Sequence, residues 1–142
     1  MRYLSIDLGV KRIGLAICDA GEAIVSPLAV IESHKGLIGK IKAAVKDYGV
    51  GAVVLGLPLN MDGSEGTASK SVRQFAEQMK KTIEIPVYFQ DERLSTFGAA
   101  EKLAAGEFTH KGKKKRLDAI AAAEILQAFL DSGRKQDPIL VK

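Results

Sequence analysis

Acidic side chains at three distant places in the sequence stand where a carboxylate could bind a metal ion. Asp7 lies near the end of an apolar run, Asp91 and Glu92 follow another apolar run, and Asp118 begins the last helical pattern. Carboxylate oxygens suit hard divalent ions such as Mg²⁺ or Mn²⁺. Two such ions about 4 Å apart can clamp the attacking water and the leaving oxygen of a phosphodiester. Together these acids predict metal-dependent hydrolysis of a nucleic-acid backbone.

Asp7 and Asp118 also have ordinary structural explanations. An isolated buried carboxylate is costly, so Asp7 needs a partner, which is either a metal ion or a backbone amide of Gly9 or Val10 in a turn. An acid in the first turn of a helix gains about 0.3–1 kcal/mol against the helix dipole, which would account for Asp118 without any metal. Each acid alone is therefore ambiguous, and the combination is more specific than any member.

The charged triplet Asp91, Glu92 and Arg93 leaves open which acid belongs to the site. In extended backbone, successive side chains point to opposite faces, so only one of the two acids can easily face Asp7. The other acid could pair with Arg93, and that pairing is an ordinary explanation for either of them. The residues alone do not decide between Asp91 and Glu92.

Basic side chains are concentrated at two places that could hold phosphate. Residues 111–116 read KGKKKR, with five cations in six positions, and such blocks either face solvent as a loop or contact nucleic acid. Lys11 and Arg12 follow Asp7 in a tight hairpin, where they hold a phosphate or form a solvated turn. The formal net charge of +4 is a mild excess. We expect nucleic acid to be the partner because the charge is clustered.

A further candidate phosphate contact lies in residues 58–66, PLNMDGSEG. The segment from Asn60 to Ser64 precedes a predicted helix, and the backbone amides at a helix N-terminus bind anions. The alternative is that Asp62 and Gly63 only form a turn and that Ser64 only caps the helix.

The apolar patterns predict three strands followed by alternating helices and strands. Helical spacing runs from Leu37 to Tyr48, where Gly49 ends the helix, and again from Val72 to Met79. Pro27 indicates an edge strand or a bulge. The expected strands are 3–8, 12–18, 23–31, 52–57 and 85–90, the later helices are 95–105 and 117–132, and 106–116 is expected to be a Gly- and Lys-rich loop.

This order predicts a mixed α/β sheet. Short connections make the first three strands an antiparallel meander, whereas helical crossovers make the fourth and fifth strands parallel and right-handed. If the first strand is parallel to the fourth and fifth, their carboxyl ends share one edge of the sheet, where sites form in open α/β sheets. Asp7, the loop 58–66 and the pair Asp91 and Glu92 would then converge.

Length and composition agree with one small domain. The 142 residues are expected to form a single domain, 1–142, with 134–142 as a peripheral tail. No apolar run approaches the roughly 18 residues of a membrane span, and the N-terminus lacks a signal-peptide layout. One cysteine, Cys18, excludes an internal disulfide and a multi-cysteine metal site. We expect a cytoplasmic protein.

Four motifs in a fixed order resemble the YqgF/RuvX family of RNase-H-like nucleases. They are DLGVKRIGLA at 7–16, GLPLNMDGSEG at 56–66, DERLST at 91–96 and DAIAAAEIL at 118–126. The similarity covers essentially residues 3–132. It implies an RNase-H-like three-layer fold, with helices on both faces of the five-stranded sheet, and a site for a divalent metal, Mg²⁺ or Mn²⁺.

The resemblance also implies roles for individual residues. Asp7 matches the first-strand acid of the family, Glu92 the acid of its Asp-Glu-Arg motif, and Asp118 the acid that opens its Asp-x-x-Ala-Ala helix. These three are the expected catalytic and metal-binding residues. The residues expected to contact nucleic acid are Lys11, Arg12, Asn60, Ser64, Arg93, Lys113, Lys114, Lys115 and Arg116.

Members of this family have been described both as Holliday-junction resolvases and as nucleases that mature the ends of pre-16S rRNA. We expect an endonuclease for 5′-end processing of pre-16S rRNA, with ribosomal precursor particles among its partners and branched DNA as the alternative substrate. The chain would act as a monomer or a homodimer. A non-catalytic nucleic-acid-binding module is a second class of function. An actin-like ATPase is disfavoured, because those enzymes close two such domains around a nucleotide.

Overall fold

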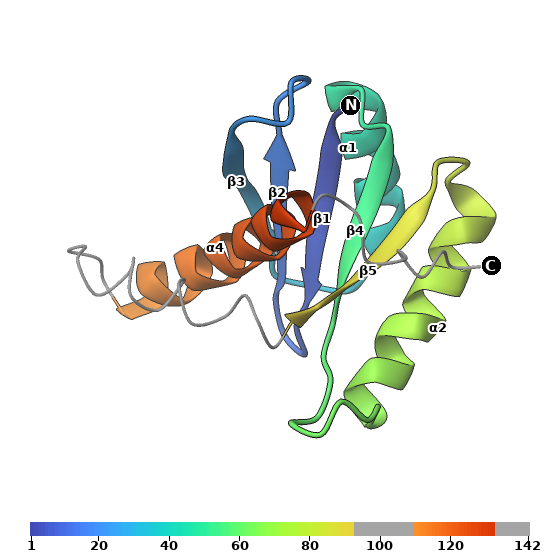
Figure 1. Ribbon diagram of the computed structural model, residues 1–142, viewed down its shortest axis with the longest axis vertical. Helices are drawn as coiled ribbons and strands as arrows, with labels where there is room; N and C mark the ends of the chain where they lie inside the picture. The colour runs from blue at the N-terminus through green and yellow to red at the C-terminus, as the bar shows by residue number, and fades with distance from the viewer. Residues whose placement is uncertain (93–109, 133–142) are drawn as a thin grey trace.

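Five strands and three helices make up the computed structural model, which describes residues 1–92 and 110–132 (Figure 1). The sheet has the order β3-β2-β1-β4-β5. The strands are β1 Tyr3–Leu8, β2 Ile13–Cys18, β3 Val25–Ile31, β4 Ala52–Leu57 and β5 Val87–Asp91, and the helices are α1 Leu37–Tyr48, α2 Thr67–Thr82 and α4 His110–Asp131. The strand β1 is antiparallel to β2 and parallel to β4, and β4 is parallel to β5, as the sequence predicts.

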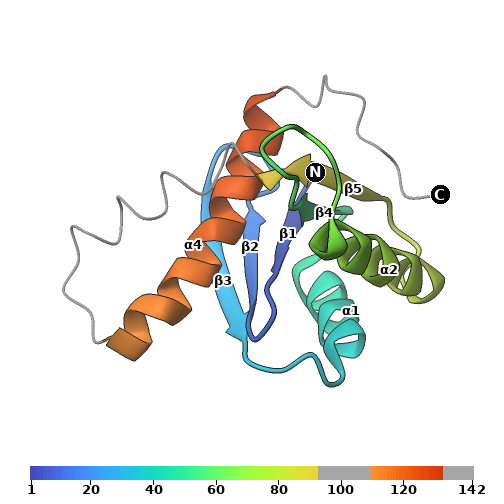
Figure 2. The ribbon, with the colours of Figure 1, turned by 90° about the horizontal axis from the view of Figure 1, so that it is seen from below.

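The helices cover both faces of the sheet and give the three layers of an RNase-H-like fold. Figure 2 shows α4 on one face and the pair α1 and α2 on the other. Alternation along β1 divides the core accordingly, because successive side chains of a strand point to opposite faces. Leu4 and Ile6 are buried with the apolar residues of α1 and α2, whereas Tyr3 packs with Ile125 and Phe129 of α4.

The helix α4 is anchored to the sheet by polar and aromatic contacts as well as by apolar packing. The hydroxyl of Ser5 donates a 2.6 Å hydrogen bond to the carbonyl oxygen of Ala122, and both residues are buried. The rings of Tyr3 and Phe129 meet edge to face with their centroids 5.4 Å apart. Odd-numbered positions of β1 therefore face α4, and Asp7 is the next of them.

The start of the last helix differs from the sequence prediction. The helix begins at His110, so residues 110–116 are helical and the expected loop is wrong for this part of the chain. Lysine and arginine are good helix formers, and several of them outweigh the roughly 1 kcal/mol cost of Gly112. The expected helix 95–105, the remainder of the loop, Arg93 and the tail 134–142 lie outside the described residues.

The edge strand β3 confirms the interpretation of Pro27. Among the described strands, β3 pairs with β2 alone, and the register shifts between Leu15 and Ala16, which face Ala29 and Pro27. Leu28 is thus the extra residue of a bulge, a place that tolerates proline because one ladder hydrogen bond is already missing. In the described ranges, no helix is long and apolar enough to cross a membrane.

Candidate active site

Asp7 lies near the carboxyl end of β1 between two glycines on neighbouring strands. Gly14 of β2 is its cross-strand partner. On the other side, Ile6 pairs with Leu55 of β4, so the parallel register places Asp7 beside Gly56. The sheet surface around this half-buried carboxylate is therefore bare on both sides, and the space is open to side chains from other elements.

Gly56 provides the space that Glu92 occupies. A Cβ atom at Gly56 would lie 3.1 Å from Cγ and 3.2 Å from Cδ of Glu92, and only 2.6 Å from Cδ1 of Ile125 on α4. The Glu92 side chain thus lies over β4 on the face that carries α4. Sequence reasoning missed this glycine, although a glycine inside the buried run AVVLGL signals a close approach by another group.

The carboxyl groups of Asp7 and Glu92 are hydrogen-bonded to each other. Burial, the hydrogen bond to Asp7 and the negative charges of Asp7 and Asp91 together raise the pKa of Glu92 from 4.5 to about 9. Glu92 is therefore protonated at neutral pH in the metal-free protein and donates to the Asp7 carboxylate. Two such groups sharing a proton mark a place of strongly negative potential, which a cation would neutralise.

The choice between Asp91 and Glu92 follows from the alternation along β5. Asp91 has the parity of Phe89, whose ring lies under the guanidinium of Arg73 from α2, with 5.0 Å between Arg73 Cζ and the ring centroid. The next residue, Glu92, turns to the opposite face and meets Asp7. The geometry agrees with the position that the family resemblance gives to Glu92.

Asp118 lies on α4 over Gly14, the cross-strand partner of Asp7, and its carboxylate interacts with a different partner. The helix α4 crosses β2 so closely at Gly14 that a Cβ there would overlap the carbonyl oxygen of Asp118. The carboxylate oxygen Oδ2 of Asp118 accepts a 2.7 Å hydrogen bond from Nε of Arg12 in the β1–β2 hairpin. Because α4 begins at His110, Asp118 lies in the third turn, and the helix dipole does not explain its presence there.

The structure brings two of the expected metal ligands into contact and places the third nearby. Within residues 1–92 and 110–132, no group of three or more His, Cys, Asp and Glu side chains is arranged to hold a metal ion. Asp118 nevertheless lies over the cross-strand partner of Asp7. The side chains of Asp7, Glu92 and Asp118 fit a hard divalent cation, since all their donors are carboxylate oxygens.

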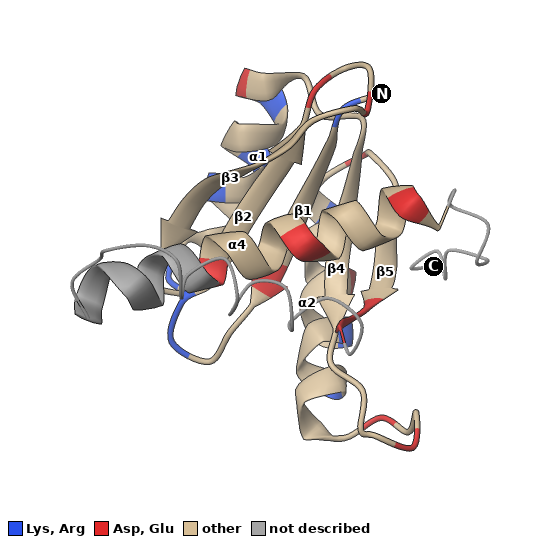
Figure 3. Ribbon diagram, turned by 60° about the vertical axis from the view of Figure 1, so that its left-hand side comes forward, with Lys and Arg blue, Asp and Glu red and all other residues tan. Residues whose placement is uncertain are grey.

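The expected nucleic-acid contacts have different surroundings. Lys11 is exposed, whereas Arg12 is partly buried in its ion pair, and Figure 3 shows the basic hairpin beside an acidic position of α4. The N-terminal end of α4 extends past β3 at the edge of the sheet (Figures 1 and 2). The backbone of residues 113–116 belongs to that end, and Arg93 lies outside the described residues.

The loop between β4 and α2 is organised by its own hydrogen bonds. The Asn60 amide donates to the Ser64 hydroxyl over 3.0 Å, and that hydroxyl donates to Asp62 over 2.6 Å. The N-cap of α2 is Gly66, so the interpretation of Ser64 as a helix cap is wrong. Asp62 forms the expected turn instead, since it also accepts the Ser64 amide over 2.9 Å. Asn60 and Ser64 are exposed at this end of the sheet.

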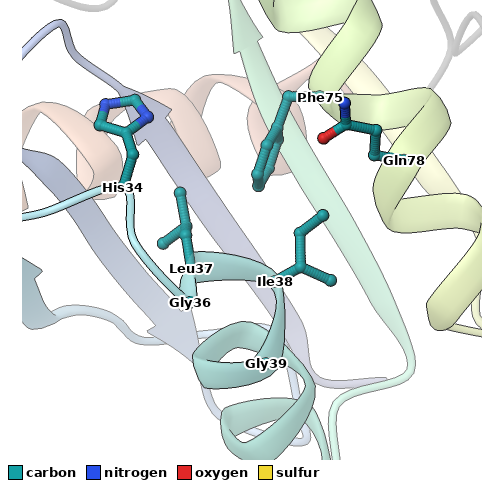
Figure 4. A pocket seen from close by; sticks show the side chains of 7 residues that line it. All are labelled: His34, Gly36, Leu37, Ile38, Gly39, Phe75 and Gln78. Carbon is teal, nitrogen blue, oxygen red and sulfur yellow. The ribbon is translucent and has the colours of Figure 1, made fainter.

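A cavity of about 360 Å³ between α1 and α2 offers a different chemistry (Figure 4). Apolar side chains such as Leu37, Ile38 and Phe75 line it together with His34 and Gln78, and no acid is among its lining residues. It therefore lacks the carboxylate ligands of a magnesium-type site. The carboxyl pair under α4 is the better candidate for phosphodiester chemistry.

Comparison with known proteins shows the family to which the chain belongs. A family model described as "RuvX: Holliday junction resolvase" matches residues 1–132. The chain belongs to the RuvX family. A relative from Anaeromyxobacter sp. (strain Fw109-5), named "Putative pre-16S rRNA nuclease", is 44% identical over 133 residues, which are 92% of this chain and 97% of the relative. A relative of the same name from Geobacillus kaustophilus (strain HTA426) is 37% identical over 94% of this chain and 100% of its own.

Solved structures share the fold of this RuvX-family protein at low identity. The fowlpox virus resolvase in complex with Holliday junction DNA has a TM-score of 0.60 at 16% identity, covering 95% of this chain and 100% of that chain. The RuvC of Thermus thermophilus in complex with a Holliday junction has a TM-score of 0.54 at 16% identity, and the match covers 94% of this chain and 96% of that chain. These structures confirm the RNase-H-like fold. The family model and the names of the curated relatives confirm the hydrolytic nuclease class, and the family is in general dependent on divalent metal.

Proposed function

We propose that this RuvX-family chain is a cytoplasmic endonuclease whose Asp7, Glu92 and Asp118 hold Mg²⁺ or Mn²⁺ at the carboxyl edge of the sheet. The observation that carries the proposal is the hydrogen-bonded contact between Asp7 and Glu92 on a surface cleared by Gly56. Two acids sharing a proton beneath a helix are costly unless a ligand uses them. A divalent cation is the ligand that suits carboxylate oxygens and replaces the proton.

The acidic and the basic side chains of the chain have different roles in the proposed reaction. Asp7, deprotonated Glu92 and, from α4, Asp118 would hold the cation. The chemistry that a bound divalent cation would supply is activation of the attacking water and stabilisation of the charge that develops on the phosphodiester. Exposed Lys11 and the basic first turns of α4 orient the backbone of the nucleic acid, since phosphate contacts position a substrate without reading its sequence.

We propose 5′-end processing of pre-16S rRNA as the reaction, with ribosomal precursor particles as the partner. The names of the curated relatives support this substrate. Branched DNA is the second candidate, supported by the description of the family and by two structural neighbours that hold Holliday junctions. A resolvase acts symmetrically on two strands, so the junction reaction would require a homodimer, whereas rRNA trimming suits a monomer.

Cleavage assays with purified protein test the proposal. Precursor rRNA and a four-way DNA junction are each incubated with Mg²⁺ or Mn²⁺. The protein added is the unsubstituted parent, the Asp7→Asn variant or the Asp118→Asn variant. We expect each variant to lose activity by at least about 100-fold, because each removes a charged oxygen ligand. Asp131→Asn is the matched control, since Asp131 lies at the other end of α4, where its carboxylate accepts a 2.8 Å hydrogen bond from Gln127 at the surface.

Two outcomes would contradict the proposal. Cleavage by Asp7→Asn and Asp118→Asn at the rate of the parent would show that the metal lies elsewhere. Salt-sensitive binding without any cleavage, unchanged in these variants, would indicate a non-catalytic binding module. The relative rates on the two substrates decide between rRNA processing and junction resolution.

A further inference from the structure

The ion pair between Arg12 and Asp118 joins a proposed phosphate contact to a proposed metal ligand. Nε of Arg12 lies 2.7 Å from Oδ2 of Asp118, and the side chains are 30% and 27% exposed. Partial burial and a short charged hydrogen bond make this pair stronger than an average pair on the surface. Oδ2 of Asp118 cannot both keep this hydrogen bond to Arg12 and coordinate a cation beside Asp7.

The arrangement of charge at the site explains why the arginine is bound there. Asp118 lies on α4 over Gly14, the cross-strand partner of Asp7, so its charge lies on the side of the sheet that carries the proposed metal ligands. Without a cation, the guanidinium of Arg12 compensates the charge of Asp118. Coordination of a divalent cation through Oδ2 of Asp118 would require this ion pair to open.

We propose that Arg12 is a positioning residue that competes with the metal ion for Asp118. In the metal-free protein Arg12 holds the Asp118 carboxylate, and when that carboxylate turns to the cation the guanidinium is released to a phosphate of the nucleic acid. This inference rests on the proposed function and deepens it. It makes metal binding and nucleic-acid binding mutually favourable, because each one gains when the ion pair opens.

The hairpin backbone is built so that only the side chain of Arg12 has to move. The amide of Gly9 donates to the carbonyl oxygens of Asp7 and Arg12, both over 3.1 Å, which closes the turn. The carbonyl oxygen of Gly9 lies 2.9 Å from Nε2 of His34, which ties the turn to the segment before α1. These bonds hold the hairpin backbone at Gly9 and Arg12, so rotation of the Arg12 side chain would be enough to exchange one anionic partner for another.

Calorimetric titration of Mn²⁺ into the free protein tests the competition without any substrate. We expect Arg12→Gln to bind Mn²⁺ about three- to tenfold more tightly than the parent, because the competing ion pair is gone. Arg12→Lys keeps the charge and is expected to lie between the two. Lys11→Gln is the matched control, since it removes one charge from the same hairpin without an ion pair to Asp118, and we expect a smaller effect.

A double-mutant cycle separates the ion pair from general electrostatics. In an Asp118→Asn background, Arg12→Gln is expected to have no further effect on Mn²⁺ affinity. Equal or weaker Mn²⁺ binding by Arg12→Gln, or the same gain in the Asp118→Asn background, would overturn the proposal. Loss of Mn²⁺ binding in Asp7→Asn is the separate sign that the metal site itself is correctly placed, and circular dichroism confirms that each variant is folded.

Discussion

Replacing Gly56 with alanine tests whether the contact between Asp7 and Glu92 depends on the bare surface of β4. The new Cβ would lie 2.6 Å from Cδ1 of Ile125 and 3.1 Å from Cγ of Glu92, so both side chains must shift. Forcing one extra methyl group into such a packed place costs about 1–3 kcal/mol of unfolding free energy. Displacing Glu92 from Asp7 should also weaken Mn²⁺ binding by about tenfold, because ligand placement controls metal affinity.

The two effects can be separated by relieving only one of the clashes. Ile125→Val removes Cδ1, so the double variant Gly56→Ala, Ile125→Val should regain part of the stability lost in Gly56→Ala but keep the weak Mn²⁺ binding. Gly51→Ala is the matched control. Its Cβ would meet only the flexible side chain of Met1, with Cγ at 2.7 Å, far from the acids.

Urea unfolding and calorimetry measure the two quantities independently. The reasoning is refuted if Gly56→Ala binds Mn²⁺ as tightly as the parent, because Glu92 would then not need the space above β4. It is also refuted if the double variant recovers full metal affinity, since the loss would then come from Ile125 and not from Glu92.

Three further predictions concern the shared proton and the contact between α4 and β2. Burial and the Asp7 carboxylate raise the pKa of Glu92 from 4.5 to about 9. The stabilisation that Glu92 contributes is therefore present below pH 4.5 and lost as the pH rises toward about 9. Urea unfolding of the metal-free protein should show this decline in unfolding free energy, and Glu92→Gln should flatten the pH dependence. Mn²⁺ binding at neutral pH should release about one proton in the parent and none from this position in Glu92→Gln, which calorimetry in buffers of different ionisation enthalpy measures. Gly14→Ala should cost about 3 kcal/mol in urea unfolding, because its Cβ would overlap the backbone of Asp118, which cannot rotate away.

The sheet was predictable from the sequence because its signals are local. The apolar runs and short connections predict the meander of β1 to β3, and the helical crossovers predict the parallel strands β4 and β5. Gly49 ends α1 in a left-handed conformation, with a φ of 63°, as a glycine at a helix end predicts. The predicted start of the last helix was wrong because a cluster of cations was interpreted as a loop, although lysine and arginine favour helices.

The site was predictable only in part because its geometry depends on contacts between distant residues. Asp7 is marked by its place in an apolar run, but nothing local shows that Glu92, and not Asp91, faces it. Gly14 and Gly56 matter because they have no side chain. Their effect can be seen only in the structure, where α4 approaches Gly14 and the Glu92 side chain approaches Gly56. The pairing of Arg12 with Asp118 joins residues 106 positions apart, and no sequence pattern announces it.

The bulged edge of β3 has a consequence for how two copies of this chain could associate. Pro27 has no N–H to donate, and the extra residue at Leu28 breaks the regular row of hydrogen-bonding groups. These two features disfavour pairing of a second molecule across β3 into a continuous sheet. A homodimer that used this side of the molecule would join through side chains and not through a shared sheet.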